Sequence, residues 1–584
     1  MTEKVTSEAE SGPSGAGIAR RNGPDSEPMP FLSNAEIADR LASLAQLLSA
    51  QKENPYKVKA YQRAAAKLRN MSESLHELVQ DETDLTQYAG IGDAIASAIR
   101  EIVQTGTLRK LETLRSEATP AMASINEYPR LDTKRVQRIY KKLGISTVKE
   151  LREKLDSGEV ERALGLRMAQ HVRQGLTETH AMLLYRGDDL RVAVEEFLVG
   201  PCRVKRAAVV GEVRRRTEII EELAFVIETD DFPAVVARLQ RYGGRTPLVS
   251  AGKDNAAFAL SSGVLLRIHL ARKDDWGLQM VACTGSKAHL KKLTAVTGPL
   301  RELKPSFASE QAFYKKFHLP YIEPELREGY DEVERAVKNT LPTLVTERDI
   351  RGELHAHSTS SDGGDSIEDM ADAAHQRGYE YIGISDHSQS LKIARGVSIG
   401  DLWAQIKYIE KLNGRLRGFR ILKSSEVDIL ADGSLDYPDV LLRELDYTVC
   451  SIHSRFGLDR QQQTERLLRA MDNRYFNILG HATGRLLLKR PGYEVDIDRV
   501  IEQARKNGCF FEINSSPDRL DLSAENARKA KVAGVLTAIN TDAHGTSELP
   551  LIRWGIDQAR RAGLETGNVL NCLTWEKLLP RFRR

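Results

Sequence analysis

Histidine and carboxylate side chains recur in short motifs throughout the last third of this chain. Two motifs, Leu-His355-Ala-His357-Ser and Thr-Asp542-Ala-His544, place two such groups two residues apart, so that on a strand both point to the same face. Neutral imidazole and carboxylate are side chains that bind divalent cations. The candidate metal ligands are nine in number: His355, His357, Asp362, His387, Glu426, His453, His481, Asp542 and His544. Because a structural zinc ion needs only about four ligands in a closed shell, this larger set predicts about two or three metal ions with open positions, an arrangement that hydrolyses phosphate esters.

Length and composition indicate the number of domains and the class of protein. At 584 residues the chain exceeds what one hydrophobic core supports, so roughly three or four domains are expected. A hydrophobic fraction of 41% and a charged fraction of 29% are typical of a soluble globular protein. The net charge of +3 does not by itself indicate nucleic-acid binding, although a pI near 8.4 permits it.

Several features concern the cellular location. Residues 1–30 are rich in Ser, Gly, Pro and Glu without an apolar segment, which predicts a disordered tail rather than a signal peptide. No apolar run in the sequence is long enough to span a membrane, so no membrane partner is expected. The five cysteines are scattered without a Cys-x-x-Cys pair, which fits a reducing cytoplasm.

Apolar residues in the first part of the chain recur at helical spacing, as in Leu41, Leu44 and Leu48. Further on, Gly90-Ile91-Gly92 lies between helical stretches and resembles a helix-hairpin-helix motif. The glycines of such a motif let backbone N–H groups and the start of the next helix approach a DNA phosphate, a contact that is blind to base sequence. An ordinary glycine-rich connection is the alternative, and the flanking helices favour DNA binding.

The run Asn54-Pro-Tyr56-Lys57-Val-Lys-Ala-Tyr61, together with the hairpin at Gly90, resembles the N-terminal domain of family X DNA polymerases. The resemblance implies a helical DNA-binding domain over residues 31–115 and a second helical, fingers-like region over residues 116–180. Thr86 and Gln87 stand where lyase-active relatives place lysines before the hairpin. A Schiff-base lyase activity is therefore not expected.

Residues 181–330 alternate predicted strands and helices and end in Leu319-Pro-Tyr-Ile-Glu-Pro-Glu-Leu-Arg-Glu-Gly329, which resembles the end of the polymerase region in bacterial family X enzymes. Thr284-Gly-Ser-Lys287 is similar to the loop that lies near the nucleotide in that family. The resemblance implies a nucleotidyltransferase-like palm and thumb. A linker is expected over residues 331–345.

The catalytic carboxylates of that polymerase region are absent from their usual positions. Nucleotidyl transfer requires about two Mg²⁺ ions held by carboxylates. Where the family has Asp-x-Asp and a third Asp on a neighbouring strand, this chain has Glu222, Ala224 and Arg267. The sequence therefore predicts an inactive polymerase site. The alternative is that Glu218, Glu221 or Glu228 substitutes, which requires a register shift that moves side chains to the other face of the strand.

Residues 346–584 alternate strands with helices, which predicts a parallel sheet or barrel. In such barrels catalytic groups gather at the carboxyl ends of the strands, where the histidine and aspartate motifs fall. The whole segment resembles the PHP (polymerase and histidinol phosphatase) domain, a distorted (β/α)7 barrel. The fold class expected for the chain is thus multidomain, α and α/β.

The PHP resemblance implies an assignment of the ligands. His355, His357, Glu426 and Asp542 would bind one metal ion; Glu426, His453 and His481 a second; Asp362, His387 and His544 a third. Any single histidine among them is more often a buried core residue, but a joint motif is far more specific than its parts. Glu353 stands where the family usually has Asp. Mn²⁺ and Zn²⁺ fit this ligand mixture, as does Fe²⁺.

Arg485 and Arg519 occupy positions at which relatives bind the substrate phosphate, a task that suits the planar guanidinium group. A surface salt bridge is the alternative for each of them. The residues expected to be catalytic are His355, His357, Glu426, His453, Asp542 and His544.

The function that these features favour is a metal-dependent DNA phosphodiesterase, a 3′–5′ exonuclease in DNA repair. The overall architecture also fits an active repair polymerase with an attached exonuclease, which the missing carboxylates oppose. A small-molecule phosphatase of the histidinol-phosphate type uses the same metal chemistry but has little use for a DNA-binding hairpin. A non-catalytic DNA-binding scaffold would leave the ligand cluster unused.

Overall fold

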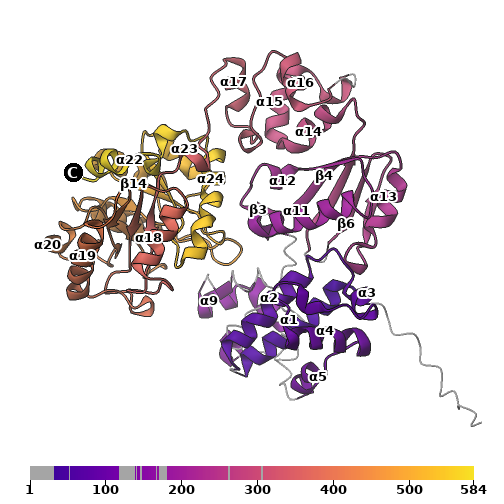
Figure 1. The fold of residues 1–584 in the computed structure, drawn as a ribbon, viewed down its shortest axis with the longest axis horizontal. Coiled ribbons are helices and arrows are strands. Elements are labelled where there is room, and N and C mark those ends of the chain that lie inside the picture. The colour runs from indigo at the N-terminus through magenta and orange to yellow at the C-terminus, as the bar shows by residue number, and fades with distance from the viewer. Residues whose placement is uncertain are drawn as a thin grey trace, which may run out of the picture.

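The computed structural model describes residues 32–51, 53–116, 148–165, 181–260, 263–303 and 307–583, with a few positions between 138 and 172 (Figure 1). The predicted tail over residues 1–30 lies outside the described residues, as does most of the predicted region 116–180. The described chain comprises a helical front region, a palm sheet with a small helical thumb, and a C-terminal barrel domain. The predicted fold class, multidomain α and α/β, is confirmed.

Local capping signals define the first helices of the front region. Ser33 caps α1 in a capping box with Glu36, and Asn54 caps α2, whose first residue is Pro55. The helices enclose one apolar core. They are α1 (Asn34–Ala50), α2 (Pro55–Leu68), α3 (Leu75–Gln80), α4 (Asp93–Thr105) and α5 (Arg109–Ser116), with a 3-10 turn η1 (Leu85–Gln87); α8 (Val148–Asp156) and α9 (Glu159–Leu164) follow.

The palm is a five-stranded sheet in the order β2-β4-β7-β6-β5, in which only β4 and β7 run parallel. Alternate residues of β4 face opposite sides, as the period of two requires. Phe225 packs with α11 and α13, whereas Val226 packs against α14. The elements are β1 (Met182–Leu183), α11 (Leu184–Val199), β2 (Arg206–Val210), α12 (Gly211–Arg214), β3 (Ile219–Ile220), β4 (Glu222–Glu228), α13 (Phe232–Leu239), β5 (Leu248–Ala251), β6 (Asn255–Ala259) and β7 (Leu265–Leu270).

The thumb is a small helical unit with its own core around Phe313 and Ile322. It contains α14 (Trp276–Thr284), α15 (Lys287–Thr297), α16 (Glu310–Lys316) and α17 (Glu332–Val337). A buried ion network joins the thumb to the palm, because Glu310 binds both Arg214 and Arg327.

The C-terminal domain contains two parallel sheets, in the orders β10-β9-β8 and β11-β12-β13-β14-β15. Bridges between Ala356 and Ala543 and between His387 and Glu426 connect the two sheets on both sides. Since β10 and β11 are separated only by Ser424 and Ser425, they act as one bent strand, and the result is a distorted seven-stranded barrel. The strands are β8 (Gly352–Ala356), β9 (Tyr381–Ile384), β10 (Arg420–Lys423), β11 (Glu426–Asp428), β12 (Val449–Ser451), β13 (Ile478–Leu479), β14 (Phe510–Asn514) and β15 (Thr537–Asn540).

Helices alternate with these strands and surround the barrel in Figure 1. Phe582 of the last helix joins the apolar cluster that includes Leu354, Tyr381 and Tyr447. The helices are α18 (Ile367–Gln376), α19 (Ile399–Asn413), α20 (Asp439–Leu442), α21 (Arg460–Met471), α22 (Ile497–Asn507), α23 (Ala524–Val532), α24 (Ile552–Arg561) and α25 (Trp575–Phe582). Within the described residues, every helix is too short or too polar to cross a membrane.

The barrel domain packs directly on the palm. Trp554 of α24, together with Leu487 and Leu520, belongs to the same apolar cluster as the palm core. Beside this contact, Arg216 of the palm binds Asp557 of α24 at 2.7 Å. The palm therefore supports the barrel domain through a shared core.

Candidate metal centre

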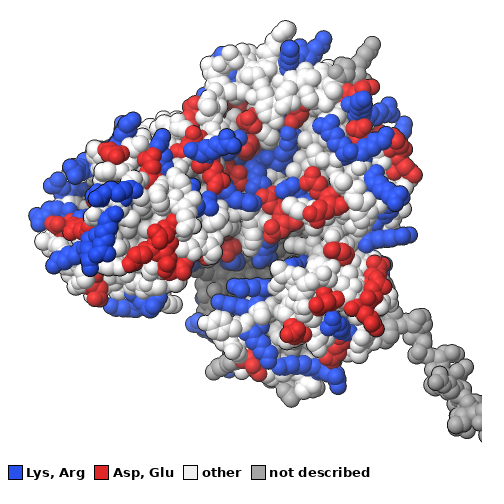
Figure 2. Space-filling model, viewed as in Figure 1, with Lys and Arg blue, Asp and Glu red and all other residues white. Residues whose placement is uncertain are grey.

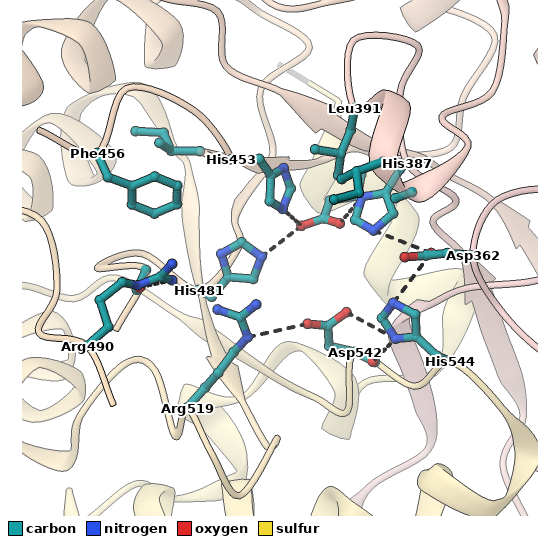
Figure 3. Close-up of a pocket in the computed structure, with 15 residues that line it drawn as sticks. Asp362, His387, Leu391, His453, Phe456, His481, Arg490, Arg519, Asp542 and His544 are labelled. Carbon is teal, nitrogen blue, oxygen red and sulfur yellow. Dashed lines mark hydrogen bonds and ion pairs between the residues drawn. The ribbon is translucent and has the colours of Figure 1, made fainter. Parts of the chain in front are cut away.

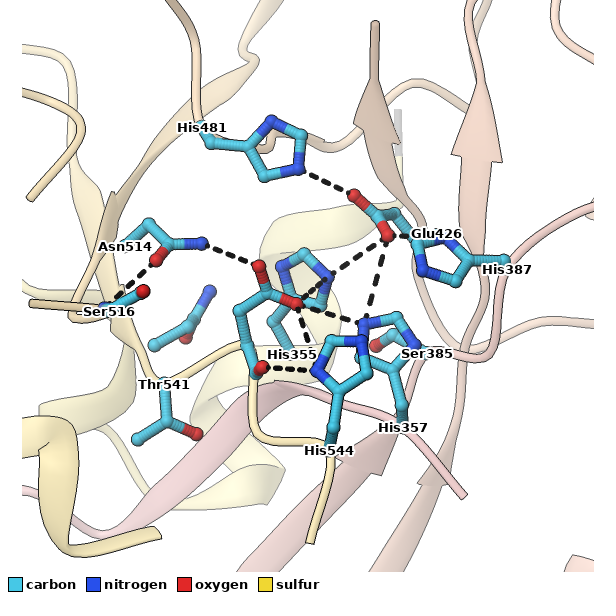
Figure 4. Close-up of polar contacts among 12 residues, drawn as sticks. His355, His357, Ser385, His387, Glu426, His481, Asn514, Ser516, Thr541 and His544 are labelled. Atoms are coloured by element: carbon cyan, nitrogen blue, oxygen red, sulfur yellow. Dashed lines mark hydrogen bonds and ion pairs between the residues drawn. The ribbon is translucent and has the colours of Figure 1, made fainter. Parts of the chain in front are cut away.

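The predicted ligands come from distant parts of the barrel domain and converge at the carboxyl ends of its strands (Figure 4). His355 and His357 lie at the end of β8, His387 follows β9, and Glu426 begins β11. His453 follows β12, His481 follows β13, and Asp542 and His544 follow β15; Asp362 lies in the loop after β8. This end of a parallel barrel is where active sites are built.

The ligand atoms fall into three overlapping groups, each with atoms that lie within 4.8 Å of one another. One group, His355, His357, Glu426 and Asp542, equals the set implied for the first metal ion. The group of His357, Asp362, His387 and His544 contains the implied third set and adds His357. The remaining group of Glu426, His453 and His387 overlaps the implied second set, whose other member, His481, has its Nε2 2.9 Å from Glu426 Oε1.

Some buried nitrogen atoms inside the cluster lack a hydrogen-bond partner. Their arrangement indicates whether these residues fit divalent cations. His355 Nε2 and His357 Nδ1 are fully buried and form no hydrogen bond. The two nearest carboxylate oxygens to His355 Nε2, on Glu426 and Asp542, are both 3.5 Å away. Buried polar atoms without a partner are costly, and atoms of these types arranged around a common point fit metal coordination. The residues present therefore fit the implied metal ions.

Electrostatic interactions within the cluster keep its carboxyl groups ionised, which is the form that binds a metal ion. Burial opposes the charged form of Asp542, but the imidazoles of His355 and His357 outweigh it and hold the pKa of Asp542 well below its usual value. In the same way His387, His453 and His355 keep the pKa of Glu426 well below its usual value despite its burial. Both groups are carboxylates at neutral pH.

The backbone at two ligands adopts a conformation that non-glycine residues rarely take. His481 has φ of 26° and Asp542 has φ of 55°. Such conformations cost free energy and concentrate at functional sites, where surrounding structure enforces them.

Glu512 is a functional residue that the motif search missed. Its carboxylate accepts hydrogen bonds from His355 Nδ1 at 2.7 Å and from the backbone N–H of His481 at 2.8 Å. The amides of Asn540 and Asn514 donate to the same group. Glu512 therefore fixes the orientation of His355 so that Nε2 points into the cluster. A charged residue within the apolar strand Phe510-Phe-Glu-Ile-Asn514 was the signal in the sequence.

Two more buried carboxylates hold the ligands in place. Asp428 accepts a hydrogen bond from His453 Nδ1. Glu353 accepts from the backbone N–H of His355 at 2.9 Å and from the hydroxyl of Thr541 at 2.9 Å, which joins β8 to β15. Complete burial raises the pKa of Glu353 to about 7. Glutamate thus occupies this position outside the ligand set, in agreement with the sequence analysis.

A cavity of about 320 Å³ opens above the cluster. Figure 3 shows Asp362 and His544 on one side of it and Phe456 and Arg490 on the other. Arg519 also lines the cavity, with Nε 3.9 Å from Asp542 Oδ2. A guanidinium group beside the cluster suits a substrate phosphate.

Arg485 lies elsewhere than the sequence analysis expected. Its guanidinium group binds the carboxylate of Glu218 in the palm at 2.8 Å and donates to the carbonyls of Arg519 and Leu520. It does not line the cavity, and these contacts correspond to the salt bridge that was its alternative interpretation. Arg490, which sequence reasoning did not single out, lines the cavity instead.

The palm positions predicted to be degenerate are adjacent in space. Ala224 of β4 is the partner of Arg267 of β7 in the parallel pairing, and Glu222 Oε2 lies 2.7 Å from Arg267 Nε. Of the alternative carboxylates, Glu218 is bound by Arg485 and Glu228 lies at the far end of β4. Glu221 remains near the position of Glu222, at the junction of β3 and β4.

The hairpin in the front region presents backbone rather than side chains. Gly90 has φ of 86°, Gly92 caps α4, and no atom lies within 4 Å of a Cβ built on either residue. Ile91 is 2% exposed and packs in the core, whereas Gly90 and Gly92 on either side of it are exposed. This geometry allows the close approach of a phosphate.

Comparisons with known proteins agree with these features. A helix-hairpin-helix domain model matches residues 32–108, and a PHP domain model matches residues 353–516. The DNA polymerase/3'-5' exonuclease PolX of Bacillus subtilis (strain 168) is 35% identical over 558 residues, which are 92% of this chain and 97% of that protein. A probable phosphatase of Thermoanaerobacter sp. (strain X514) is 30% identical over 230 residues, 38% of this chain and 89% of that protein. A probable phosphatase of Acetivibrio thermocellus is 28% identical over 203 residues, 33% of this chain and 76% of that protein.

The full-length similarity to a polymerase and exonuclease, together with the hairpin domain, implies DNA binding, and the PHP match with its ligand clusters indicates metal binding. The similarities to probable phosphatases are shorter and cover 38% and 33% of this chain. The chain therefore belongs to the bacterial family X DNA polymerases that carry a C-terminal PHP domain.

Proposed function

We propose that this protein is a metal-dependent DNA phosphodiesterase, a 3′–5′ exonuclease of DNA repair whose polymerase module is inactive. The observation that carries the proposal is the convergence of nine imidazole and carboxylate ligands below a cavity that Arg519 also lines. About two or three Mn²⁺, Zn²⁺ or Fe²⁺ ions fit this ligand set. When bound, divalent cations supply a nucleophilic water and charge neutralisation to phosphodiester hydrolysis.

The residues of the cavity divide the remaining tasks. Arg519 is positioned to bind the scissile phosphate, since its guanidinium group lies in the cavity near Asp542. Glu512 and Asp428 hold His355 and His453 in fixed orientations by accepting hydrogen bonds from their Nδ1 atoms. The ligands are therefore preorganised, so little reorganisation is needed when the substrate binds.

The remaining domains act as DNA-binding supports in this proposal. The hairpin at Gly90 to Gly92 would contact the sugar–phosphate backbone without regard to base sequence. Positive and negative side chains are interspersed over the face shown in Figure 2, which agrees with a net charge of only +3. On that face, DNA binding would depend on local contacts rather than on a broad basic surface.

The contacts at the three positions where the family has catalytic carboxylates support an inactive polymerase module. Glu222 already neutralises Arg267, and a methyl group occupies position 224. Nucleotidyl transfer requires at least about two cations between carboxylates, and a guanidinium group at their centre would repel them. The name of the Bacillus relative includes DNA polymerase, so an active polymerase is the alternative to be tested.

A small-molecule phosphatase is the second candidate function. It is favoured by the similarity of about a third of the chain to probable phosphatases. It is opposed by the similarity to a polymerase and exonuclease over 92% of the chain, which includes the DNA-binding front region.

A primer–template substrate labelled at the 5′ end of the primer tests these alternatives. The protein is incubated with Mn²⁺, with and without dNTPs, beside a His355→Ala/His357→Ala double variant. We expect stepwise shortening of the primer without extension, and no shortening by the variant. Extension of the primer, or shortening that persists in the variant, would refute the proposal. Release of phosphate from phosphomonoesters without shortening of DNA would favour the phosphatase.

A further inference from the structure

A short loop between Ser388 and Val397 lies at the mouth of the metal cavity. A bridge pairs its two ends, and the backbone N–H of Val397 donates to the carbonyl of His387 at 2.8 Å. Its tip is the 3-10 turn Lys392–Ala394. Because the loop follows the metal ligand His387 directly, its tip is held close to the cluster.

The loop places an apolar side chain at the edge of a polar site. Ile393 at the tip is 93% exposed and lines the cavity, as does the neighbouring Leu391. In Figure 3, Leu391 lies beside His387, and Phe456 lines another part of the cavity. A single exposed isoleucine is common on protein surfaces. Here, however, it lines the same cavity as Leu391 and Phe456, so that the wall of the cavity offers apolar side chains to a ligand group.

Hydrogen bonds fix the loop to the residues that orient the metal ligands. Ser390 Oγ donates to Asp428 Oδ2 at 2.5 Å, and Asp428 is the partner of His453. The backbone N–H of Ser390 donates to Asp436 at 2.7 Å. On the other wall, the guanidinium group of Arg490 lies 4.6 Å from the ring centre of Phe456, which holds that ring in a defined position. Ser390 at the base of the loop and the ring of Phe456 are thus held in defined positions relative to the cluster.

We propose that Leu391, Ile393 and Phe456 bind the base of the 3′-terminal nucleotide while its phosphodiester lies at the metal cluster. This inference rests on the proposed exonuclease function and deepens it, because a site that only removed phosphate groups would need no apolar surface beside its ligands. Apolar and stacking contacts accept every base, so degradation would proceed without sequence preference. The cations Lys392 and Arg395 flank Ile393 in the loop and suit the phosphates of the adjoining strand.

The test pairs a change in the protein with a change in the substrate. Two single-stranded oligonucleotides are used that differ only at the 3′-terminal residue, which is either thymidine or an abasic tetrahydrofuran nucleotide. The kcat/KM for removal of that residue is measured with Mn²⁺ for the full chain and for Ile393→Ala. A matched control is Val532→Ala, since Val532 is 84% exposed at the end of α23 and does not line the cavity.

We expect the unchanged protein to remove thymidine about fivefold to tenfold faster than the abasic residue, as loss of a partly buried apolar contact predicts. Ile393→Ala should lower kcat/KM for thymidine and leave the abasic value nearly unchanged, so that the preference becomes smaller while Leu391 and Phe456 still contact the base. Val532→Ala should keep the full preference. Because Ile393 is exposed, its replacement should leave the melting temperature unchanged.

Two results would overturn the inference while leaving the exonuclease function intact. One is equal removal of both termini by the unchanged protein, and the other is a preference that Ile393→Ala retains in full. If neither oligonucleotide is shortened by the unchanged protein, the proposed function fails and the base-binding surface fails with it.

Discussion

Glu222 and Arg267 lie on the adjacent parallel strands β4 and β7 of the palm, and their Oε2 and Nε atoms are 2.7 Å apart. Both side chains are about one-third exposed, so solvent screens the pair and its contribution to stability is small. Its consequence is chemical, because Glu222, the one carboxylate among the three predicted polymerase positions, is occupied by a cation of the protein itself.

Restoring the carboxylates should restore cation binding in the palm. We expect the Glu222→Asp/Ala224→Asp/Arg267→Asp triple variant to bind about one or two more Mn²⁺ ions than the unchanged protein. Equilibrium dialysis with Mn²⁺ measures the number of bound ions. The single variant Arg267→Ala is the control and should add none, since it leaves only one carboxylate. An identical number of ions in the triple variant would argue against the proposed correspondence of these positions.

The ligand motifs could be read from the sequence because spacing on strands fixes the direction of side chains. His355 and His357 end one strand, and Asp542 and His544 follow another, so the fold brings both pairs to one end of the barrel. Residues that contact one another across the fold have no characteristic spacing in the sequence. The sequence analysis missed Glu512 because its role depends on contacts that run from β14 to His355 of β8 and to His481 after β13. It also placed Arg485 at the substrate phosphate, whereas docking of the palm turns that side chain toward Glu218.

Replacement of Glu512 by Gln should weaken metal binding without preventing folding. The amide oxygen can still accept from His355 Nδ1, but the negative charge that supports the imidazole is lost. Substitution of such an outer partner typically costs about tenfold to 100-fold in metal affinity, which titration with Mn²⁺ would measure. Glu525→Gln, at an exposed position of α23, is the matched control and should bind Mn²⁺ normally. Equal affinity of the two variants would show that Glu512 does not orient the ligands.

Arg485 and Glu218 should behave as a coupled pair across the interface of palm and barrel. Their atoms are 2.8 Å apart and both side chains are less than one-fifth exposed, so either single substitution leaves the other charge poorly compensated. We expect Arg485→Ala and Glu218→Ala each to lower the melting temperature, and the double variant to lose less than the sum of the two. A coupling of at least about 0.5 kcal/mol is typical of residues in contact. Strict additivity in thermal unfolding would contradict the pairing.

Trp554 should be a major contributor to the same interface. It is 6% exposed although it belongs to α24 of the barrel domain, because it packs in the palm core. Replacement of a buried tryptophan by alanine typically costs about 3–5 kcal/mol in the free energy of unfolding. We expect Trp554→Ala to show such a loss in chemical denaturation, whereas Val532→Ala should change stability by less than about 0.5 kcal/mol. A small loss for Trp554→Ala would mean that the domains do not pack in this way in solution.

Metal binding should release protons, because several candidate ligand imidazoles are charged in the metal-free protein. Burial opposes the charge of His355, but Glu512 and Asp542 outweigh it and hold its pKa well above the usual value. Burial opposes the charge of His453, but Glu426 and Asp428 outweigh it and raise its pKa to about 10. Burial also opposes the charge of His544, and Asp362 and Asp542 raise its pKa to about 9. Because the pKa of each imidazole is higher in the folded than in the unfolded protein, protonation stabilises the metal-free fold below the ordinary pKa of histidine. For His453 and His544, this stabilisation is lost as the pH rises through 9 to 10.

An imidazole must be neutral to bind a metal ion, so a charged ligand histidine loses its proton when Mn²⁺ binds. For each proton lost in this way, the Kd for Mn²⁺ should fall about tenfold per pH unit between pH 7 and 9. The difference in melting temperature between Mn²⁺-loaded and chelated protein should widen over the same range. Calorimetric titration in two buffers with different ionisation enthalpies counts the released protons directly. A Kd that stays constant from pH 7 to 9 would show that these imidazoles are already neutral or are not ligands.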